Sequence, residues 1–399
     1  MIVGVVGKAN VGKSTLFKAM TLADVEIANY PFATIKPNNG VGFVRLPCAD
    51  AFFNVQCNPR EGFCINHQRF VPVNLIDVAG LVPGAHEGKG LGNQFLDDLR
   101  QAHCLIHVVD AAGTTNERGE PIPAGTYDPV NDVKFLEVEM DMWYLGIFKR
   151  VWEKFSRQIY LEKQEPYKAI AKQFSGLNVT ENMIKELINK MNLDQENATK
   201  WTEDQLFRFA KELRKRTKPM IIAANKVDIG VGAENFQRLK KEFPDYTIIA
   251  CSAESELALK EASKHKLISY VPGDADFQPA DGAKLTEPQN KGLSFIKENV
   301  LDKFGSTGVQ EVLNRAVFDL LKYIAIFPGG LNKLEDQYGR TLPDCFLLPP
   351  GSTALDFAFK IHTDLGQHFI RAIDVKSKRP VGKEHMLNNL DVIEIIADR

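Results

Sequence analysis

The stretch that decides the fold is Ile2-Val3-Gly4-Val5-Val6, followed at once by Gly7-Lys8-Ala9-Asn10-Val11-Gly12-Lys13-Ser14. Its second part fits the pattern G-x-x-x-x-G-K-[ST], in which glycines let backbone N–H groups turn inward on phosphates. The run before it fits a strand, and the run from Thr15 to Met20 fits a helix whose positive N-terminal dipole faces the phosphates. We expect Lys13 to reach the β- and γ-phosphates and the Ser14 hydroxyl to ligate Mg²⁺. The nucleotide-binding residues expected from this segment are Gly7, Lys8, Ala9, Asn10, Val11, Gly12, Lys13, Ser14 and Thr15.

The composition is that of an ordinary soluble globular protein, with 44% hydrophobic and 25% charged residues. The length of 399 residues predicts two or three domains. A net charge of −2 excludes the overall basic field of a non-specific nucleic-acid binder but leaves room for local basic patches. Met1 leads into a strand rather than a signal peptide, and no apolar run approaches the ~18 residues of a membrane span. We therefore expect a cytoplasmic protein that binds neither DNA nor a membrane.

Five short, β-branched apolar runs lack the alternation of half-buried strands and fit buried parallel strands instead. They are Ile2–Val6, Val71–Ile76, Cys104–Val109, Met220–Ala223 and Thr247–Ala250. Because helical segments separate them, the sequence predicts an α/β fold: a doubly wound, mostly parallel sheet with helices on both faces. Ligands of such sheets bind at the carboxyl ends of the strands.

A helical region interrupts this pattern. Apolar residues from Tyr144 to Ile159 recur at helical spacing, and Thr202 with Gln205 forms the capping box of a helix through Leu213. We expect an all-helical insertion over 133–218 within an α/β domain over 1–132 and 219–330. Its last helix ends in a basic cluster, defined as Lys211, Arg214, Lys215, Arg216 and Lys218. Two interpretations of this basic cluster stay open: cations favoured by the helix dipole, or an RNA-contacting patch.

In the C-terminal third, the sequence predicts helices near Gly292–Val300 and Val309–Ala325. It then predicts a break at Phe327-Pro328-Gly329-Gly330. A small α+β domain over 341–399 follows, with a short helix opening near Thr353. Its expected strands are Cys345–Leu348, Phe369–Ile373 and Val392–Ile396.

Polar signatures follow three of the predicted parallel strands. Asp77 and Gly80 follow the second strand, where a carboxylate holds Mg²⁺, usually through water, and a glycine N–H contacts the γ-phosphate. Asp228 ends Asn225-Lys226-Val227-Asp228, and its two acceptor oxygens match the N1–H and exocyclic amine of guanine, a donor pair that adenine lacks. Here Asn225 would tie base-contacting segments together and the Lys226 stem would pack over the base. The supporting loop expected after the next strand is Ser252, Ala253 and Glu254.

The two segments on either side of Asp77 fit nucleotide-sensing switches. Thr34 is the expected switch threonine, closing on Mg²⁺ and the γ-phosphate. The glycine-rich segment from Gly84 to Gly92 fits a mobile switch. Leu81 stands where many GTPases have a Gln that orients the attacking water, so we expect slow intrinsic hydrolysis unless another group, with His86 the nearest candidate, aligns that water.

The order and spacing of these motifs resemble the Obg superfamily of translation-factor-related GTPases, and within it the YchF branch. The resemblance rests on the segments 29–37 and 77–86, on the helical insertion, and on a tail that is similar to a TGS domain, a β-grasp module, at Leu348–Ala354 and Leu390–Ile395. It implies the ribosome or RNA as a partner. Many YchF-type proteins carry a Glu at the position of Asp228 and prefer ATP, so an ATP preference is not carried over to this chain.

The sequence is therefore interpreted as a GTPase switch that hydrolyses GTP to GDP and phosphate. In this interpretation Lys13 and Mg²⁺ stabilise charge, Thr34 and Gly80 position the reactants, and Ser14, Thr34 and Asp77 hold the metal. Asn10 stands where potassium-activated GTPases supply an oxygen to K⁺, which makes K⁺ a second candidate cofactor. The alternatives are an ATP-preferring hydrolase and a ribosome- or RNA-associated adaptor in which the nucleotide is mainly structural.

The cysteines fall into two groups. Cys104 and Cys251 lie in strand-like runs and fit buried free thiols. Cys48, Cys57, Cys64 and His67 lie closer together, but their spacing is not that of a standard zinc knuckle. Free or oxidised thiols in a loop-rich hairpin are the preferred interpretation, and a metal site stays the alternative.

Overall fold

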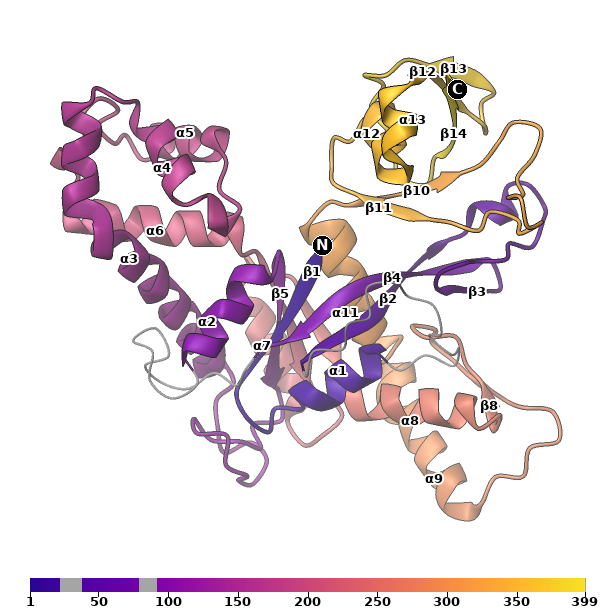
Figure 1. Cartoon of the computed structure of the whole chain (residues 1–399). Helices are drawn as coiled ribbons and strands as arrows, with labels where there is room; N and C mark the ends of the chain where they lie inside the picture. Colours follow the sequence, from indigo (N-terminus) through magenta and orange to yellow (C-terminus); the bar gives the residue numbers. More distant parts are fainter. Residues whose placement is uncertain (22–37, 79–91, 399) are drawn as a thin grey trace. The chain divides into compact units, whose positions relative to one another are not determined.

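A computed structural model describes residues 1–21, 38–78 and 92–398 of the chain (Figure 1). The chain divides into two compact units: Met1–Phe17 with Leu75–Glu254, and Lys18–Asn74 with Ser255–Arg399. Within the described residues, no helix is both long and apolar enough to cross a bilayer.

A parallel sheet forms the centre of the first unit. Its strands run in the order β4, β1, β5, β6, β7, and the four from β1 to β7 pair in parallel. Every residue of β5 and β6 is buried, which explains their uninterrupted apolar runs. All five strands expected from the sequence are confirmed, as β1 (Ile2–Val6), β4 (Gln68–Asp77), β5 (Cys104–Asp110), β6 (Met220–Asn225) and β7 (Ile248–Cys251). Helices α1 (Lys13–Thr21), α2 (Gly92–Gln101) and α7 (Gly232–Glu242) lie between these strands along the chain, and α8 (Ala253–Lys264) follows β7.

The region between β5 and β6 is helical, as expected. It comprises α3 (Val130–Leu161), α4 (Pro166–Gln173), η3 (Ser175–Leu177), α5 (Glu181–Lys190), η4 (Ala198–Lys200) and α6 (Glu203–Thr217). The capping box of Thr202 and Gln205 opens α6. Figure 1 shows α3 leading away from the sheet, with α6 beside it. Phe148 of α3 packs against Phe174 and Phe209, with ring centroids 4.1 and 5.6 Å apart. This buried cluster continues without interruption into Leu105 of the sheet.

The basic cluster at the end of α6 is largely neutralised within the fold. Arg214 is buried, and its Nε donates to Asp141 Oδ1 at 2.8 Å. Lys218 is also buried and donates to two backbone carbonyls. The half-exposed Arg216 pairs with Glu186 at 2.8 Å. The alternative of an RNA-contacting patch is therefore wrong for Arg214 and Lys218, because their charges do not reach the surface.

A hairpin lies near the start of the second unit, where the sequence predicts a loop-rich hairpin around Cys48, Cys57 and Cys64. In this hairpin β3 (Phe63–Ile65) pairs antiparallel with β4, and β2 (Asn39–Pro47) lies beside β4 as the first strand of the sheet order. A 3₁₀ turn, η1 (Ala49–Ala51), follows β2. The later elements are β8 (Ile268–Ser269), β9 (Gln278–Pro279), α9 (Glu287–Ile296), the π-helical η5 (Lys297–Leu301), α10 (Asp302–Phe304), α11 (Val309–Asn314) and the π-helical η6 (Arg315–Leu320). The helix expected through Ala325 therefore ends at Leu320.

Five strands form a second sheet at the C-terminal end, in the order β11, β10, β14, β12, β13. They are β10 (Ile324–Pro328), β11 (Phe346–Leu348), β12 (Phe369–Asp374), β13 (Arg379–Val381) and β14 (Val392–Ala397). Helices α12 (Ala354–Ile361) and α13 (Thr363–Gln367) accompany the sheet, and Thr353 caps α12 as expected. Strand β10 pairs in parallel with β14, although it lies outside the range 341–399 expected for this domain. Ala325, expected at a helix end, is a fully buried residue of this strand.

Candidate nucleotide-binding site

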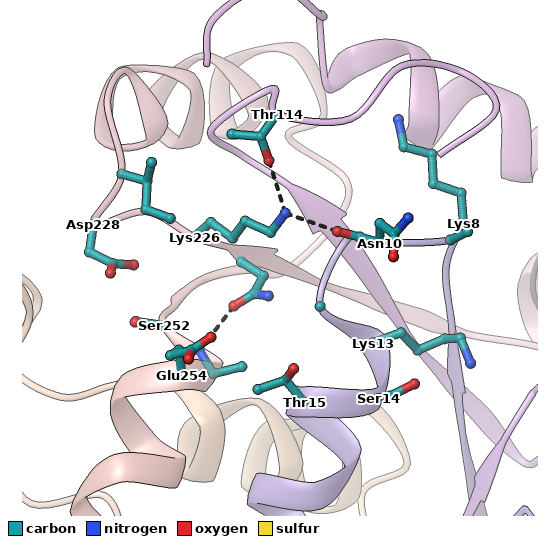
Figure 2. Close-up of a pocket in the computed structure, with 15 residues that line it drawn as sticks. Lys8, Asn10, Lys13, Ser14, Thr15, Thr114, Lys226, Asp228, Ser252 and Glu254 are labelled. Atoms are coloured by element: carbon teal, nitrogen blue, oxygen red, sulfur yellow. Dashed lines mark hydrogen bonds between the residues drawn. The ribbon is translucent and has the colours of Figure 1, made fainter. Parts of the chain in front are cut away.

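A cleft of about 720 Å³ lies in the first unit at the carboxyl ends of the parallel strands (Figure 2). Its size is typical of a small-molecule site. The residues lining it are Lys8, Ala9, Asn10, Gly12, Lys13, Ser14, Thr15, Thr114, Asn225, Lys226, Asp228, Ile229, Ser252, Ala253 and Glu254. Gly7 and Val11, which the sequence also suggested, are buried and do not line the cleft. Two of the three polar signatures of the sequence, Asn225–Asp228 and Ser252–Glu254, thus line the cleft together with the phosphate loop.

The loop between β1 and α1 has the backbone of a phosphate cradle. Gly12 has a φ of +90°, and a Cβ at this position would collide with the side-chain amide of Asn225, so only glycine fits. The amide N–H of Leu16 donates to the Gly12 carbonyl at 2.9 Å and starts the helix. Lys13, at the first turn, forms an ion pair with Asp77 Oδ1. The structure therefore brings together the two residues expected at the γ-phosphate and the metal.

The amine of Lys8 faces away from the cleft. It is buried, and its Nζ donates to Asp132 Oδ1 at 2.9 Å and to the Thr115 carbonyl at 3.1 Å. It also lies 3.8 Å from the centre of the Tyr127 ring. Burial raises the pKa of Asp132, which the neighbouring Lys8 ammonium opposes. Lys8 can therefore offer the phosphates its backbone N–H but not its charge.

Asn225 joins the phosphate loop to the loop after β7. Its Nδ2 donates to the Val11 carbonyl at 2.9 Å, and its Oδ1 accepts from the Ala253 amide at 3.0 Å. The side chain is buried, so water does not compete well for these bonds. The bridging geometry expected of this asparagine is present in the structure.

Lys226 is held by a network that sequence reasoning missed. Its Nζ donates to the Asn10 carbonyl at 2.9 Å, to Asp110 Oδ2 at 3.0 Å and to Thr114 Oγ1 at 2.9 Å. Thr114 itself donates to Asp110 Oδ2 at 2.6 Å. The available signal was that Asp110 ends a buried parallel strand, where polar groups meet the ligand. This network fixes the aliphatic stem of Lys226 along the cleft.

Asp228 is half-buried at the other end of the cleft. Figure 2 shows Asp228 and Ser252 on one side, and Lys13 and Ser14 on the other. Among the residues that the structure describes, none forms a hydrogen bond or ion pair with the Asp228 carboxylate. A carboxylate with free acceptor oxygens thus faces one end of the cleft, and a phosphate cradle lies at the other.

Four residues of the predicted machinery lie outside the described residues: Thr34, Gly80, Leu81 and His86. Their expected roles therefore stay predictions.

The second group of cysteines is brought together in the second unit. Cys48, Cys57 and Cys64 are free thiols, and each places its sulfur near the others and near Asp50. His67, which the sequence grouped with them, instead places Nδ1 2.9 Å from Asp50 Oδ1. The three thiols therefore lie together, and the ligand-type side chain grouped with them is the carboxylate of Asp50 and not the imidazole of His67.

Three family descriptions match the chain. Residues 2–131 match a 50S ribosome-binding GTPase, residues 223–329 the G4 motif-containing domain of YGR210-like Obg-like GTPases, and residues 338–397 a TGS domain. An uncharacterized GTP-binding protein of Methanocaldococcus jannaschii is 50% identical, with 99% of each chain covered. The ribosome-binding ATPase YchF of Escherichia coli O157:H7 is 29% identical over 92% of this chain and 86% of its own.

Solved structures agree with these matches. The crystal structure of a GTP binding protein from Pyrococcus horikoshii superposes with a TM-score of 0.79 at 41% identity, covering 100% of both chains. This similarity spans both the nucleotide cleft and the C-terminal sheet. The chain belongs to the Obg-like GTP-binding proteins that carry a C-terminal TGS domain.

Proposed function

We propose that the protein hydrolyses GTP to GDP and phosphate as a conformational switch acting on the ribosome or RNA. The observation that carries the proposal is the cleft itself, with an unpaired carboxylate at one end and the Gly12–Ser14 loop at the other. The ribosomal partner is suggested by the names of relatives, which include ribosome-binding ATPases. In domain terms, we propose a G domain at 1–132 and 219–330, a helical insertion at 133–218 and a TGS domain at 341–399, to which β10 adds a strand.

Guanine selectivity would come from Asp228. Its two acceptor oxygens suit the two donors of the guanine edge, and adenine would leave the carboxylate unpaired in a site closed by the base. Ser252, Ala253 and Glu254 line the same end, where a backbone N–H would meet the guanine carbonyl. The fixed stem of Lys226 would cover one face of the base.

The phosphate end would carry the chemistry. Water would attack the γ-phosphorus in line, and the bond from that phosphorus to the β–γ bridging oxygen would break, with GDP as the leaving group. Lys13 would move from Asp77 to the β- and γ-phosphates and neutralise developing charge. Thr34 and Gly80 would position the reacting groups, and His86 is the candidate for aligning the water.

The donor set fits Mg²⁺. Ser14 offers a hydroxyl and Asp77 a carboxylate, both hard oxygen donors, and the phosphates would supply others. Bound there with Thr34, the ion would neutralise phosphate charge. For K⁺, the side-chain Nδ2 of Asn10 donates to the Gly119 carbonyl at 2.9 Å, which leaves Oδ1 as the atom that would face a cation.

Base selectivity is tested by titrating the full-length protein with fluorescent GTP and ATP analogues. GTP should bind more tightly, and Asp228→Asn should weaken GTP and relatively favour xanthosine triphosphate, whose carbonyl replaces the amine. Glu242→Gln is the matched control, because it neutralises an exposed carboxylate of α7 that does not line the cleft and should leave selectivity unchanged. Equal or tighter binding of ATP by the wild type would refute the proposal in favour of an ATP-preferring hydrolase.

The second candidate is an adaptor in which nucleotide is mainly structural. It is favoured by Leu81, which cannot orient water as a glutamine does. Single-turnover hydrolysis with and without ribosomes separates the two candidates. A rate that rises when ribosomes are added supports the switch, whereas bound GTP that persists in both conditions supports the adaptor.

A further inference from the structure

A compact set of metal-ligating atoms lies in the second unit, apart from the residues of the nucleotide cleft. The sulfurs of Cys48, Cys57 and Cys64 and a carboxylate oxygen of Asp50 all lie within 4.8 Å of one another. Cys48 directly follows β2, Asp50 lies in η1, Cys57 belongs to the following loop and Cys64 to β3 (Figure 1). Cys48, Asp50 and Cys57 are buried and Cys64 is half-buried. Four ligand atoms from separate points along the hairpin thus converge on one spot.

Their spacing suits a tetrahedral ion. Zinc–sulfur bonds of about 2.3 Å place the sulfurs of a tetrahedral site about 3.8 Å apart. The Cys48 and Cys57 sulfurs are 3.5 Å apart, and the Cys64 sulfur lies 3.8 Å from Asp50 Oδ2. A disulfide instead requires about 2.05 Å between sulfurs. We propose that Cys48, Asp50, Cys57 and Cys64 bind a zinc ion.

The surroundings of the four ligands match the needs of such a site. Three thiolates and one carboxylate carry two more charges than the ion, and the buried Arg69 guanidinium lies next to them, with Nη1 3.6 Å from the Cys57 sulfur. His67 Nδ1 lies 2.9 Å from Asp50 Oδ1. The Cys57 amide donates to Asp50 Oδ2, the oxygen beside the Cys64 sulfur, at 3.0 Å. Outer partners of this kind orient metal-bound carboxylates.

The site would be structural rather than catalytic, because four protein ligands leave no open position. It would hold in place the loop around Asn58 and Arg60, which binds residues 341–343 just before β11. Within this unit, the Asn58 amide donates to the Thr341 carbonyl and the Arg60 amide to the Pro343 carbonyl, both at 2.9 Å. Arg69 also donates to the Pro343 carbonyl, at 2.8 Å. The ion would therefore fix the segment that leads into the C-terminal sheet.

Elemental analysis of the full-length protein, purified with zinc and dialysed against metal-free buffer, tests the site. We expect one zinc per chain in the wild type and a loss of at least tenfold in occupancy in Cys57→Ser and Cys64→Ser. Cys104→Ser is the matched control, because Cys104 is a buried thiol of β5, and it should retain one zinc. Wild-type protein without zinc, or with iron in its place, would overturn the assignment.

Two measurements on the wild type keep the proposal testable if the variants do not fold. Replacement of zinc by Co²⁺ should give the thiolate charge-transfer absorption and the visible bands of a tetrahedral site. Thiol titration of the unfolded protein, after purification without reductant, should find all six cysteines free. A count of four, which a Cys48–Cys57 disulfide would leave, or absence of the Co²⁺ bands would contradict it.

Discussion

Removing the Asn225 side chain should damage both the stability of the first unit and its nucleotide affinity. Asn225→Ala leaves the Val11 carbonyl and the Ala253 amide without their partners, and both residues are almost completely buried. Each unpaired buried group costs about 1–3 kcal/mol, so the free energy of unfolding should fall by about 3 kcal/mol. Because the phosphate loop loses its tie to the base-side loop, nucleotide binding should weaken by about tenfold or more, equivalent to about 1.4 kcal/mol.

The assay uses urea unfolding followed by tryptophan fluorescence, since Trp143, Trp152 and Trp201 all belong to the first unit. Fluorescent GDP measures affinity on the same samples. Asn235→Ala is the matched control: its amide makes one bond, to the Ala111 carbonyl at 2.8 Å, and it does not line the cleft. It should lose about 1.5 kcal/mol with unchanged affinity. If Asn225→Ala behaves like this control in both measurements, the reasoning is refuted.

Three further predictions concern pH, potassium and the basic cluster. Burial, assisted by the nearby Lys8, lowers the pKa of His107 in the folded protein to about 3. The unfolded chain, in which the histidine has its usual pKa of about 6.5, therefore binds a proton at a higher pH than the folded chain does. This contribution to the free energy of unfolding is present above about pH 6.5 and is lost below it, by about 2 kcal/mol between pH 7 and pH 5. His107→Leu should reduce this dependence of the unfolding free energy on pH, measured by urea titration at each pH. GTP hydrolysis should be faster in KCl than in NaCl at equal ionic strength, and Asn10→Ala should abolish the difference; identical wild-type rates would exclude a potassium mechanism. Arg214→Ala should lower the free energy of unfolding by about 3–5 kcal/mol because it strands a buried carboxylate, whereas Arg216→Ala should cost below about 1 kcal/mol; similar losses in both would contradict the assignment of Arg214 to the core.

Strands β1, β5 and β6 were predictable because they are buried along almost their whole length and are therefore mainly apolar. Strand β2 was not, because glycines and Arg45 interrupt its pattern. The sequence does not reveal strand β10, because Phe327-Pro328-Gly329-Gly330 indicates a break, whereas the strand runs through Pro328 and the glycines follow it. The glycines do end an element, but this element is the strand β10 and not the helix expected through Ala325.

Some features of the candidate site could likewise be predicted from the local sequence, and others depend on the fold. Positions dictated by backbone geometry, such as Gly12, follow from the local pattern. The partner of Lys8 could not be found that way, because Asp132 lies 124 residues along the chain and meets it only through the fold. Asp50 was overlooked among the cysteines because a single carboxylate in a short turn carries no ligand pattern of its own. Its place beside the Cys57 amide and the Cys64 thiol becomes evident only when β2 and β3 are both in place.

Because the apolar packing between α3 and the rest of its unit is continuous, a small tilt at the base of this helix would produce a larger displacement at its far end. Leu136, near its start, shares a cluster with Phe95 and Leu99 of α2, the helix that directly follows residues 79–91. From Leu136 to Leu161 the axis extends about 38 Å, so a tilt of about 6° at the base displaces the tip by about 4 Å. Tyr160 and Leu161 at that tip are 53% and 78% exposed. A displacement of α2 too small to open the core would thus become a movement of several ångströms at a distant apolar surface.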